Sequence, residues 1–228
     1  MKLSIIMPVY NEEGTILKIL EKVYNTDVNM EKEIIIVDDY STDRTRDILK
    51  KVNKNNTKII YHEKNMGKCD AIKTGLKYST GDLVIIQDAD LEYDPQDYKK
   101  LLKPILKNEA EVVYGSRFLK KFKKDETFIL SHYLGNKFLS VLTTILYKNK
   151  ITDMETCYKL FKKDVIKNIK LESRKFGFEP EITAKVLKKY KIKEVPISFY
   201  PRDFEHGKKI NWKDGVQHIF YLIKYRFK

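Results

Sequence analysis

Residues 83–90 read LVIIQDAD, an apolar run that is followed by two aspartates with one residue between them. Residues 34–39, IIIVDD, repeat this arrangement earlier in the chain. A short, continuous apolar run bounded by polar residues indicates a strand that is buried on both faces, as in a parallel sheet. The two stretches therefore predict an α/β fold in which acidic residues follow the strand ends.

Short β-branched runs alternate with amphipathic stretches over the first half of the chain. Strands are expected at residues 3–7, 33–37, 58–61, 83–87 and 111–114. Between them, apolar residues recur at helical spacing within residues 16–23, 48–52 and 71–76. This alternation is typical of βαβ units, so we expect a Rossmann-like, doubly wound and mostly parallel sheet.

Beyond Arg117 the pattern is looser. A lysine-rich loop at residues 118–127 precedes a long amphipathic stretch at 132–148. At 228 residues, the chain is expected to form one domain. The remaining elements that we expect are a strand at 158–161, a helix at 179–190, a strand at 194–199, a polar loop through 210 and a final amphipathic, aromatic-rich helix.

The charge balance favours anionic partners, because 45 lysines and arginines face 32 acidic residues. Nucleotide phosphates, anionic lipid and nucleic acid all fit this charge. Cys69 and Cys157 lie in unrelated contexts without CxxC spacing, which predicts reduced thiols rather than a disulfide or a zinc site. The chain starts without a signal-peptide pattern, and no stretch approaches the ~20 apolar residues of a membrane span, so we expect a cytoplasmic location.

Polar clusters follow three of the expected strands. They read PVYNEE at residues 8–13, DDYSTD at 38–43 and DADLE at 88–92. One such cluster would be explained by a turn and a helix cap, because Asn, Asp, Ser and Thr favour those positions. In open parallel sheets, however, ligands bind beyond the carboxyl ends of the strands, near the switch in strand order. Three clusters together predict a ligand site there.

The acidic cluster suggests a divalent cation. Strand alternation would place Asp88 and Asp90 on one side of the chain, and Glu92 continues that series. Mg²⁺ and Mn²⁺ prefer oxygen ligands and commonly take one or two carboxylates together with substrate phosphates. The alternative is a solvated acidic turn that leads into a helix start at Asp94 and Pro95.

The ordered motifs PVYNEE, VDDYSTDRT (37–45), NMGK (65–68) and DADLEY (88–93) resemble family 2 glycosyltransferases of the GT-A fold. GSRF (115–118), DMETCYK (153–159), FE (178–179), VPI (195–197), Arg202 and GKKI (207–210) resemble the dolichol-phosphate mannosyltransferase and polyprenyl-phosphate glycosyltransferase branch. The resemblance covers essentially the whole chain. It implies a single GT-A domain in which residues 1–115 bind a nucleotide-sugar, 116–210 form the acceptor side and 211–228 form an amphipathic terminal helix.

The resemblance implies roles for individual residues at the donor site. Asp90 and Glu92, next to Asp88, would hold Mg²⁺ or Mn²⁺. Relatives usually have glycine where this chain has Tyr40, so a positive φ in that turn would strain the tyrosine. The residues that would cradle the nucleotide-sugar are Pro8, Tyr10, Glu12, Val37, Asp39, Asp88, Ala89 and Asp90.

Four cations are candidates for binding the phosphates: Arg117, Arg202, Lys208 and Lys209. Arginine offers a planar fork to phosphate, whereas lysine acts as a point charge. A phosphate acceptor is already a nucleophile, so Asp153 would only need to orient it, but a hydroxyl acceptor would need a general base, either Asp153 or Glu155. The alternative is that Asp153 caps a turn. The candidate catalytic residues are Asp90, Arg117, Asp153 and Arg202.

The resemblance favours an inverting hexosyltransferase that uses a GDP-mannose or UDP-glucose type donor and a polyprenyl or dolichyl phosphate acceptor. A saccharide hydroxyl in surface-glycan assembly is the alternative acceptor. A non-enzymatic nucleotide-binding module is a third hypothesis. Nucleic acid is not expected as a partner, because the acidic cluster would repel its phosphates unless a cation were bound.

Two amphipathic segments raise the question of membrane contact. Apolar residues recur at helical spacing within 134–146 and within 216–227, and basic and aromatic residues accompany the second segment. Such helices suit a bilayer interface, but they also suit packing on the core or on a second subunit. With the lysines at 120–124, they predict peripheral contact with the cytoplasmic face of the membrane.

Overall fold

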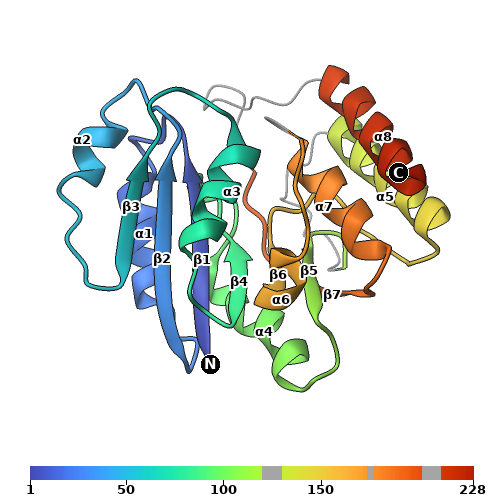
Figure 1. The fold of residues 1–228 in the computed structure, drawn as a ribbon, viewed down its shortest axis with the longest axis horizontal. Coiled ribbons are helices and arrows are strands. Elements are labelled where there is room, and N and C mark those ends of the chain that lie inside the picture. The colour runs from blue at the N-terminus through green and yellow to red at the C-terminus, as the bar shows by residue number, and fades with distance from the viewer. Residues whose placement is uncertain (120–129, 174–176, 202–211) are drawn as a thin grey trace.

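The computed structural model describes residues 1–119, 130–173, 177–201 and 212–228. In the second range the side chains are described from residue 133 onward, and in the fourth range from residue 215 onward. Within these ranges the chain forms one seven-stranded sheet with the order β3-β2-β1-β4-β6-β5-β7 (Figure 1). The strands are β1 (Lys2–Val9), β2 (Glu31–Asp38), β3 (Thr57–Tyr61), β4 (Leu83–Ile86), β5 (Val112–Ser116), β6 (Lys159–Lys162) and β7 (Ile192–Pro196).

The sheet is parallel except at β6, which pairs antiparallel with both β4 and β5. From β1 the chain winds outward through β2 to β3, and then returns to place β4 on the other side of β1. The reversal of strand order therefore lies between β1 and β4. The predicted doubly wound, mostly parallel α/β fold is confirmed.

Helices cover both faces of the sheet (Figure 1). Helices α1 (Ile16–Asn25) and α4 (Tyr98–Leu106) share one core with strand residues such as Ile34 and Ile36. The neighbouring Ile35 and Val37 belong to a second core on the other face. The continuous apolar run of β2 therefore serves two cores at once. The second core contains residues of α3 (Lys68–Tyr78), α5 (Leu130–Tyr147), α6 (Lys163–Lys167), α7 (Phe178–Leu187) and α8 (Trp212–Phe227).

Most predicted elements occur within a few residues of their expected positions. The predicted strand at 194–199 instead begins at Ile192 and ends at Pro196. Helix α4 was not predicted; Asp94 caps the preceding 3₁₀ turn, Pro95–Asp97, by accepting from the backbone N–H of Gln96. The short helix α2 (Thr45–Leu49) lies beyond the end of β2. Among the residues that the structure describes, none of the helices is both long and apolar enough to span a bilayer.

Tyr40 has a φ of 67°, so the expected strain in the turn after β2 is confirmed. Its ring contacts the guanidinium of Arg46, whose central carbon lies 5.3 Å from the ring centroids of both Tyr40 and Tyr61. Arg46 is held in place because it also donates to Asp38 Oδ2 at 2.7 Å. The cation–π contact offsets part of the backbone strain.

This balance predicts different effects for two substitutions of Tyr40. Both Tyr40→Ala and Tyr40→Gly remove the ring contact, but only glycine also relieves the positive φ. We expect the alanine variant to be less stable than the glycine variant by about 1 kcal/mol. Urea unfolding would measure the difference in the free energy of unfolding, provided that this free energy depends equally steeply on urea concentration in both variants. Equal stabilities would show that the turn is not strained.

Candidate functional site

The three polar clusters follow β2, β1 and β4, which are neighbours in the sheet. Hydrogen bonds join the first two clusters directly. The backbone N–H of Asn11 donates to Ser41 Oγ at 3.0 Å, and the Asn11 side-chain oxygen accepts from the backbone N–H of Thr42 at 2.8 Å. The clusters therefore meet at the carboxyl edge beside the β1/β4 switch, where open α/β sheets bind ligands.

Asp39 organises the loop that leads into α3. Its buried carboxylate accepts hydrogen bonds from the backbone N–H groups of Met66, at 2.9 Å, and Gly67, at 2.6 Å. It also lies 2.8 Å from Nδ1 of His62. Gly67 has a φ of 92°, which a residue with a side chain would adopt only under strain. The predicted contact of Asp39 with the base or ribose stays a prediction.

The other residues predicted to cradle the nucleotide have different surroundings. Pro8 and Tyr10 are partly exposed at the end of β1, whereas the Val37 side chain is fully buried in the core beneath this edge. Glu12 helps to start α1, because its carboxylate accepts from the Thr15 hydroxyl at 2.7 Å. Ala89 is also buried. We infer that any direct contact with a ligand by Val37 or Ala89 would involve the backbone.

The strand alternation predicted for Asp88, Asp90 and Glu92 does not continue as far as Glu92, because β4 ends at Ile86 and Leu91 has a φ of 65°. A chain that bends in this way does not keep successive side chains on alternate faces. Asp88 pairs with Lys68 at 2.9 Å, and Asp90 accepts from the backbone N–H of Glu92 at 3.1 Å. Within the described part of the chain, no three His, Cys, Asp or Glu side chains form a group that could hold a metal ion.

Lys68 is a residue of this edge whose chemistry the sequence did not indicate. Its ammonium lies 2.9 Å from Asp88 and 3.0 Å from Glu179 of α7, and it donates to Cys157 Sγ at 3.3 Å. Burial alone would lower the pKa of Lys68, but Asp88, Cys157 and Glu179 raise it well above its ordinary value. Through these ion pairs, Lys68 joins the end of β4 to the second half of the chain.

Arg117 and Asp153 form a bidentate ion pair at the end of β5. Nε and Nη2 of Arg117 each donate to a different Asp153 oxygen at 2.7 Å, and the Arg117 backbone N–H donates to Oδ2 at 3.0 Å. Burial alone would lower the pKa of Arg117, but Asp153 raises it well above its ordinary value. Asp153 is fully buried, and Arg117 donates to both of its carboxylate oxygens. Of the three guanidinium nitrogens of Arg117, only Nη1 takes no part in these bonds.

Tyr93 connects this ion pair to the acidic cluster. Its ring packs 4.8 Å from Tyr158 and 5.3 Å from Phe199, and its hydroxyl accepts from the Cys157 backbone N–H at 3.3 Å. Burial raises the pKa of Tyr93, while Arg117 lowers it and Glu92 adds a smaller increase. Arg117 and Glu92 are therefore both close enough to act on one buried hydroxyl.

A second buried lysine follows Asp153 in the sequence. Burial lowers the pKa of Lys159 to about 8, and its ammonium donates to the Met154 carbonyl at 2.8 Å. Nearby, Glu155 Oε2 lies 3.0 Å from Nδ1 of His218 on α8. Glu155, the other candidate base for a hydroxyl acceptor, therefore ties the loop at 153–157 to the terminal helix.

Three predicted phosphate ligands, Arg202, Lys208 and Lys209, lie outside the described residues, as do the lysines at 120–124. Their roles stay predictions.

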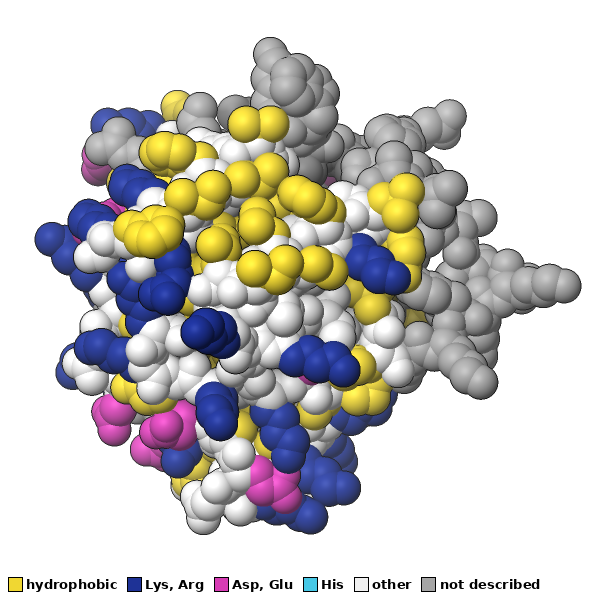
Figure 2. All heavy atoms as spheres, turned by 90° about the vertical axis from the view of Figure 1, so that its right-hand side faces the viewer, with side chains coloured by type: hydrophobic (Ala, Val, Ile, Leu, Met, Phe, Trp, Pro, Cys, Tyr) yellow, Lys and Arg dark blue, Asp and Glu magenta, His cyan; other side chains and the backbone are white. Residues whose placement is uncertain are grey.

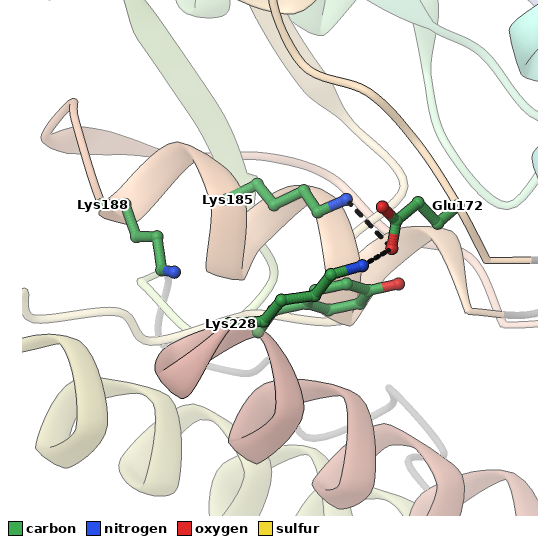
Figure 3. Close-up of a pocket in the computed structure, with 5 residues that line it drawn as sticks. Glu172, Lys185, Lys188 and Lys228 are labelled. Atoms are coloured by element: carbon green, nitrogen blue, oxygen red, sulfur yellow. Dashed lines mark hydrogen bonds and ion pairs between the residues drawn. The ribbon is translucent and has the colours of Figure 1, made fainter.

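A separate pocket lies between α7 and the end of α8 (Figure 3). There, Lys228 and Lys185 point toward Glu172, at 2.6 and 4.0 Å, and Lys188 lies apart. None of the predicted site residues lines this pocket, and we interpret it as a surface cluster of ion pairs.

Comparison with known proteins identifies the family. The model of the family described as Glycosyl transferase family 2 matches residues 4–170. The chain is 30% identical over 230 aligned residues to a dolichol-phosphate mannosyltransferase of Pyrococcus furiosus, covering 99% of this chain and 64% of that protein. It is 32% identical to a UDP-N-acetylglucosamine–dolichyl-phosphate N-acetylglucosaminyltransferase of Methanococcus voltae, covering 96% of this chain and 93% of that protein.

The fold also matches a solved structure. Glucosyl-3-phosphoglycerate synthase of Mycobacterium tuberculosis, crystallised with Mn²⁺, UDP and glucosyl-3-phosphoglycerate, superposes with a TM-score of 0.74 at 17% identity, covering 99% of this chain and 80% of that one. At this identity, the match concerns the fold alone. The family match covers more than half of the chain, and the resemblance found in its motifs is confirmed. The chain belongs to glycosyl transferase family 2.

Proposed function

We propose that this chain transfers a hexose, with inversion, from a nucleotide-sugar to a polyprenyl or dolichyl phosphate. The observation that carries the proposal is the meeting of three polar clusters beside the β1/β4 switch of a family 2 fold. The Pyrococcus and Methanococcus relatives are both named for dolichyl phosphate but differ in the sugar. The relatives therefore support the acceptor class more strongly than any particular donor.

The donor would lie across the carboxyl ends of β2, β1 and β4. Pro8, Tyr10 and Glu12 come from the end of β1, and Asp39 from the end of β2. In this arrangement Asp39 sets the loop before α3, while the partly exposed Pro8 and Tyr10 offer ring surfaces to the base or ribose. The phosphates would then extend toward Asp90 and Arg117.

A divalent cation fits the chemistry of this edge. The described residues supply no protein-only metal cage, but Mg²⁺ and Mn²⁺ commonly need just one or two carboxylates when substrate phosphates complete their shell. Asp90 and Glu92, to which the family resemblance gives this role, would supply those carboxylates, and Asp88 is paired with Lys68. When bound, the cation would neutralise negative charge on the departing nucleoside diphosphate.

The Arg117–Asp153 pair favours a phosphate acceptor over a hydroxyl. A hydroxyl must lose its proton to a base, whereas a phosphate oxygen attacks without one. Asp153 is poorly suited to be that base, because it is fully buried and both its oxygens accept from Arg117. Glu155, the other candidate, is mostly buried beside His218. Nη1 of Arg117 would be the part of this pair that binds a phosphate oxygen.

The decisive experiment follows the label from the donor to the acceptor. The chain would be incubated with radiolabelled UDP-glucose or GDP-mannose, Mg²⁺ or Mn²⁺, and a short polyprenyl phosphate, followed by extraction into organic solvent. We expect label in the organic phase with at least one donor. Transfer only to added oligosaccharide would instead support the hydroxyl alternative, and no transfer from a panel of nucleotide-sugars would contradict the proposal.

Asp90→Asn should abolish most of the transfer without unfolding the chain. The substitution removes the charge that would bind the cation but keeps a side-chain oxygen for the Glu92 backbone N–H. We expect turnover to fall about 100-fold or more, as when a comparable electrostatic group is lost. Asp82→Asn, before the amino end of the same strand, is the matched control and should leave turnover unchanged. Equal activity of the two variants would remove Asp90 from the site.

Lys68→Met should lower both stability and turnover, because Asp88 and Glu179 would lose their shared cation. Removing one member of a largely buried pair costs about 3 kcal/mol. Adding Glu179→Gln should restore part of that loss, since it removes one of the two uncompensated charges. Urea unfolding and steady-state kinetics would measure both effects, and a double variant no more stable than Lys68→Met would argue against a charge effect.

A further inference from the structure

Helix α5 leaves an apolar stripe exposed to solvent. Its members follow one another at i, i+4, i+7 and i+11, so they lie on one face of the helix. They are between 50% and 68% exposed. Leu139 and Thr143, on the opposite side, are buried. The stripe consists of Leu134, Phe138, Val141 and Ile145.

Helix α8 repeats this arrangement with the same spacing. Its exposed apolar residues are between 44% and 82% exposed, whereas His218, Leu222 and Tyr225 on the other side are buried. A terminal helix that only packed on the core would bury its one apolar face, but α8 is apolar on both sides. The exposed stripe consists of Val216, Phe220, Ile223 and Phe227.

The two stripes form one surface, because α5 and α8 pack side by side (Figure 1). The Tyr147 hydroxyl of α5 donates to the Leu222 carbonyl of α8 at 2.7 Å and fixes this pairing. Figure 2 shows apolar side chains gathered in a continuous band on this side of the molecule. Contiguous apolar surfaces of this kind mark docking sites, unlike single exposed apolar residues.

The charge around this surface is mainly positive. Helix α5 contains no aspartate or glutamate, and α8 contains one, Asp214, near its start. Figure 2 shows Lys and Arg side chains bordering the apolar band on this side, with most of the visible Asp and Glu side chains gathered farther below it. The exposed basic residues of 133–150 and 215–227 are Lys137, Lys148, Lys150, Lys224 and Arg226, whereas Lys228 pairs with Glu172.

We propose that the paired stripes of α5 and α8, the docking face, seat this protein on an anionic phospholipid bilayer. The apolar side chains would enter the boundary between headgroups and acyl chains, and the surrounding cations would contact lipid phosphates. A second copy fits this face poorly, because a self-complementary contact would bring two mainly positive surfaces together. Charge complementarity therefore favours the membrane.

The proposal deepens the proposed function, on which its biological purpose rests, because a polyprenyl phosphate resides in a membrane. The buried side of α8 carries His218, which pairs with Glu155 in the loop that also holds Asp153. The docking face is thus one helix away from a loop that we assign to the acceptor side. Seating α8 on the bilayer would hold that loop near the membrane surface.

Vesicle sedimentation tests the docking face without requiring catalysis. The full chain would be mixed with vesicles of phosphatidylcholine alone or of phosphatidylcholine with phosphatidylglycerol, at low and rising salt. We expect binding to the anionic vesicles that weakens as salt increases. Absence of binding to anionic vesicles at low salt would overturn the proposal.

Two double variants, each with a matched control, distinguish binding through this face from nonspecific adsorption to the vesicles. Phe138→Ser with Phe220→Ser removes one large residue from each stripe and should weaken binding at least about tenfold. Leu17→Ser with Leu106→Ser is the matched control, because those leucines are similarly exposed on α1 and α4. Lys137→Gln with Lys224→Gln should weaken binding about fivefold per cation, whereas Lys18→Gln with Lys103→Gln, on α1 and α4, should not. Equal loss in test and control variants would contradict the assignment.

Two further measurements distinguish the remaining outcomes. Sedimentation velocity would reveal a dimer, and a dimer that the Phe138→Ser and Phe220→Ser pair abolishes would assign the face to a second copy instead. Transfer to a detergent-dispersed acceptor tests the chemistry alone. Transfer without vesicle binding would reject the docking face but keep the proposed function. Vesicle binding without transfer would keep the docking face but reject the proposed function.

Discussion

The burial of three adjacent strands on both faces constrains the rest of this structure. Ile34 and Ile36 of β2 enter one core and Ile35 enters the other, so no polar side chain can be placed at these positions without a large desolvation cost. Polar chemistry is therefore confined to the strand ends. Because β2, β1 and β4 are parallel neighbours, their carboxyl ends meet at one edge, and the reversal of strand order beside β1 opens that edge to a ligand.

This constraint explains why the sequence predicted the sheet well. Continuous apolar runs located the strands of the first half, and the polar residues that follow them located the candidate site. The antiparallel insertion of β6 between β4 and β5 could not be predicted, because a short run such as residues 158–161 does not reveal its partner. Helix α4 was not predicted, although Asp94 and Pro95 mark a helix start just before it.

Prediction within the site failed wherever distant segments meet. The alternation of Asp88 and Asp90 assumed a strand that in fact ends at Ile86. Lys68 lies in a motif that was recognised, but its bridge to Glu179 joins residues 111 positions apart (179 − 68). The strain at Tyr40 was foreseen because it depends on local φ alone, whereas the compensating contact with Arg46 required the fold. Local chemistry was thus predictable and tertiary pairing was not.

The pairing of buried charges decides which chemistry this edge supports. Asp88 and Glu179 share the Lys68 ammonium, and Asp153 is paired with Arg117, so these three carboxylates are engaged by protein cations. A carboxylate whose oxygens already accept from a cation is poorly placed to take a proton from an acceptor hydroxyl. Asp90 and Glu92 belong to the acidic cluster after β4, and their charge suits a divalent cation. The site is therefore better arranged to bind charged phosphates between cations than to remove a proton from a hydroxyl, which is why an acceptor that arrives as a phosphate fits it.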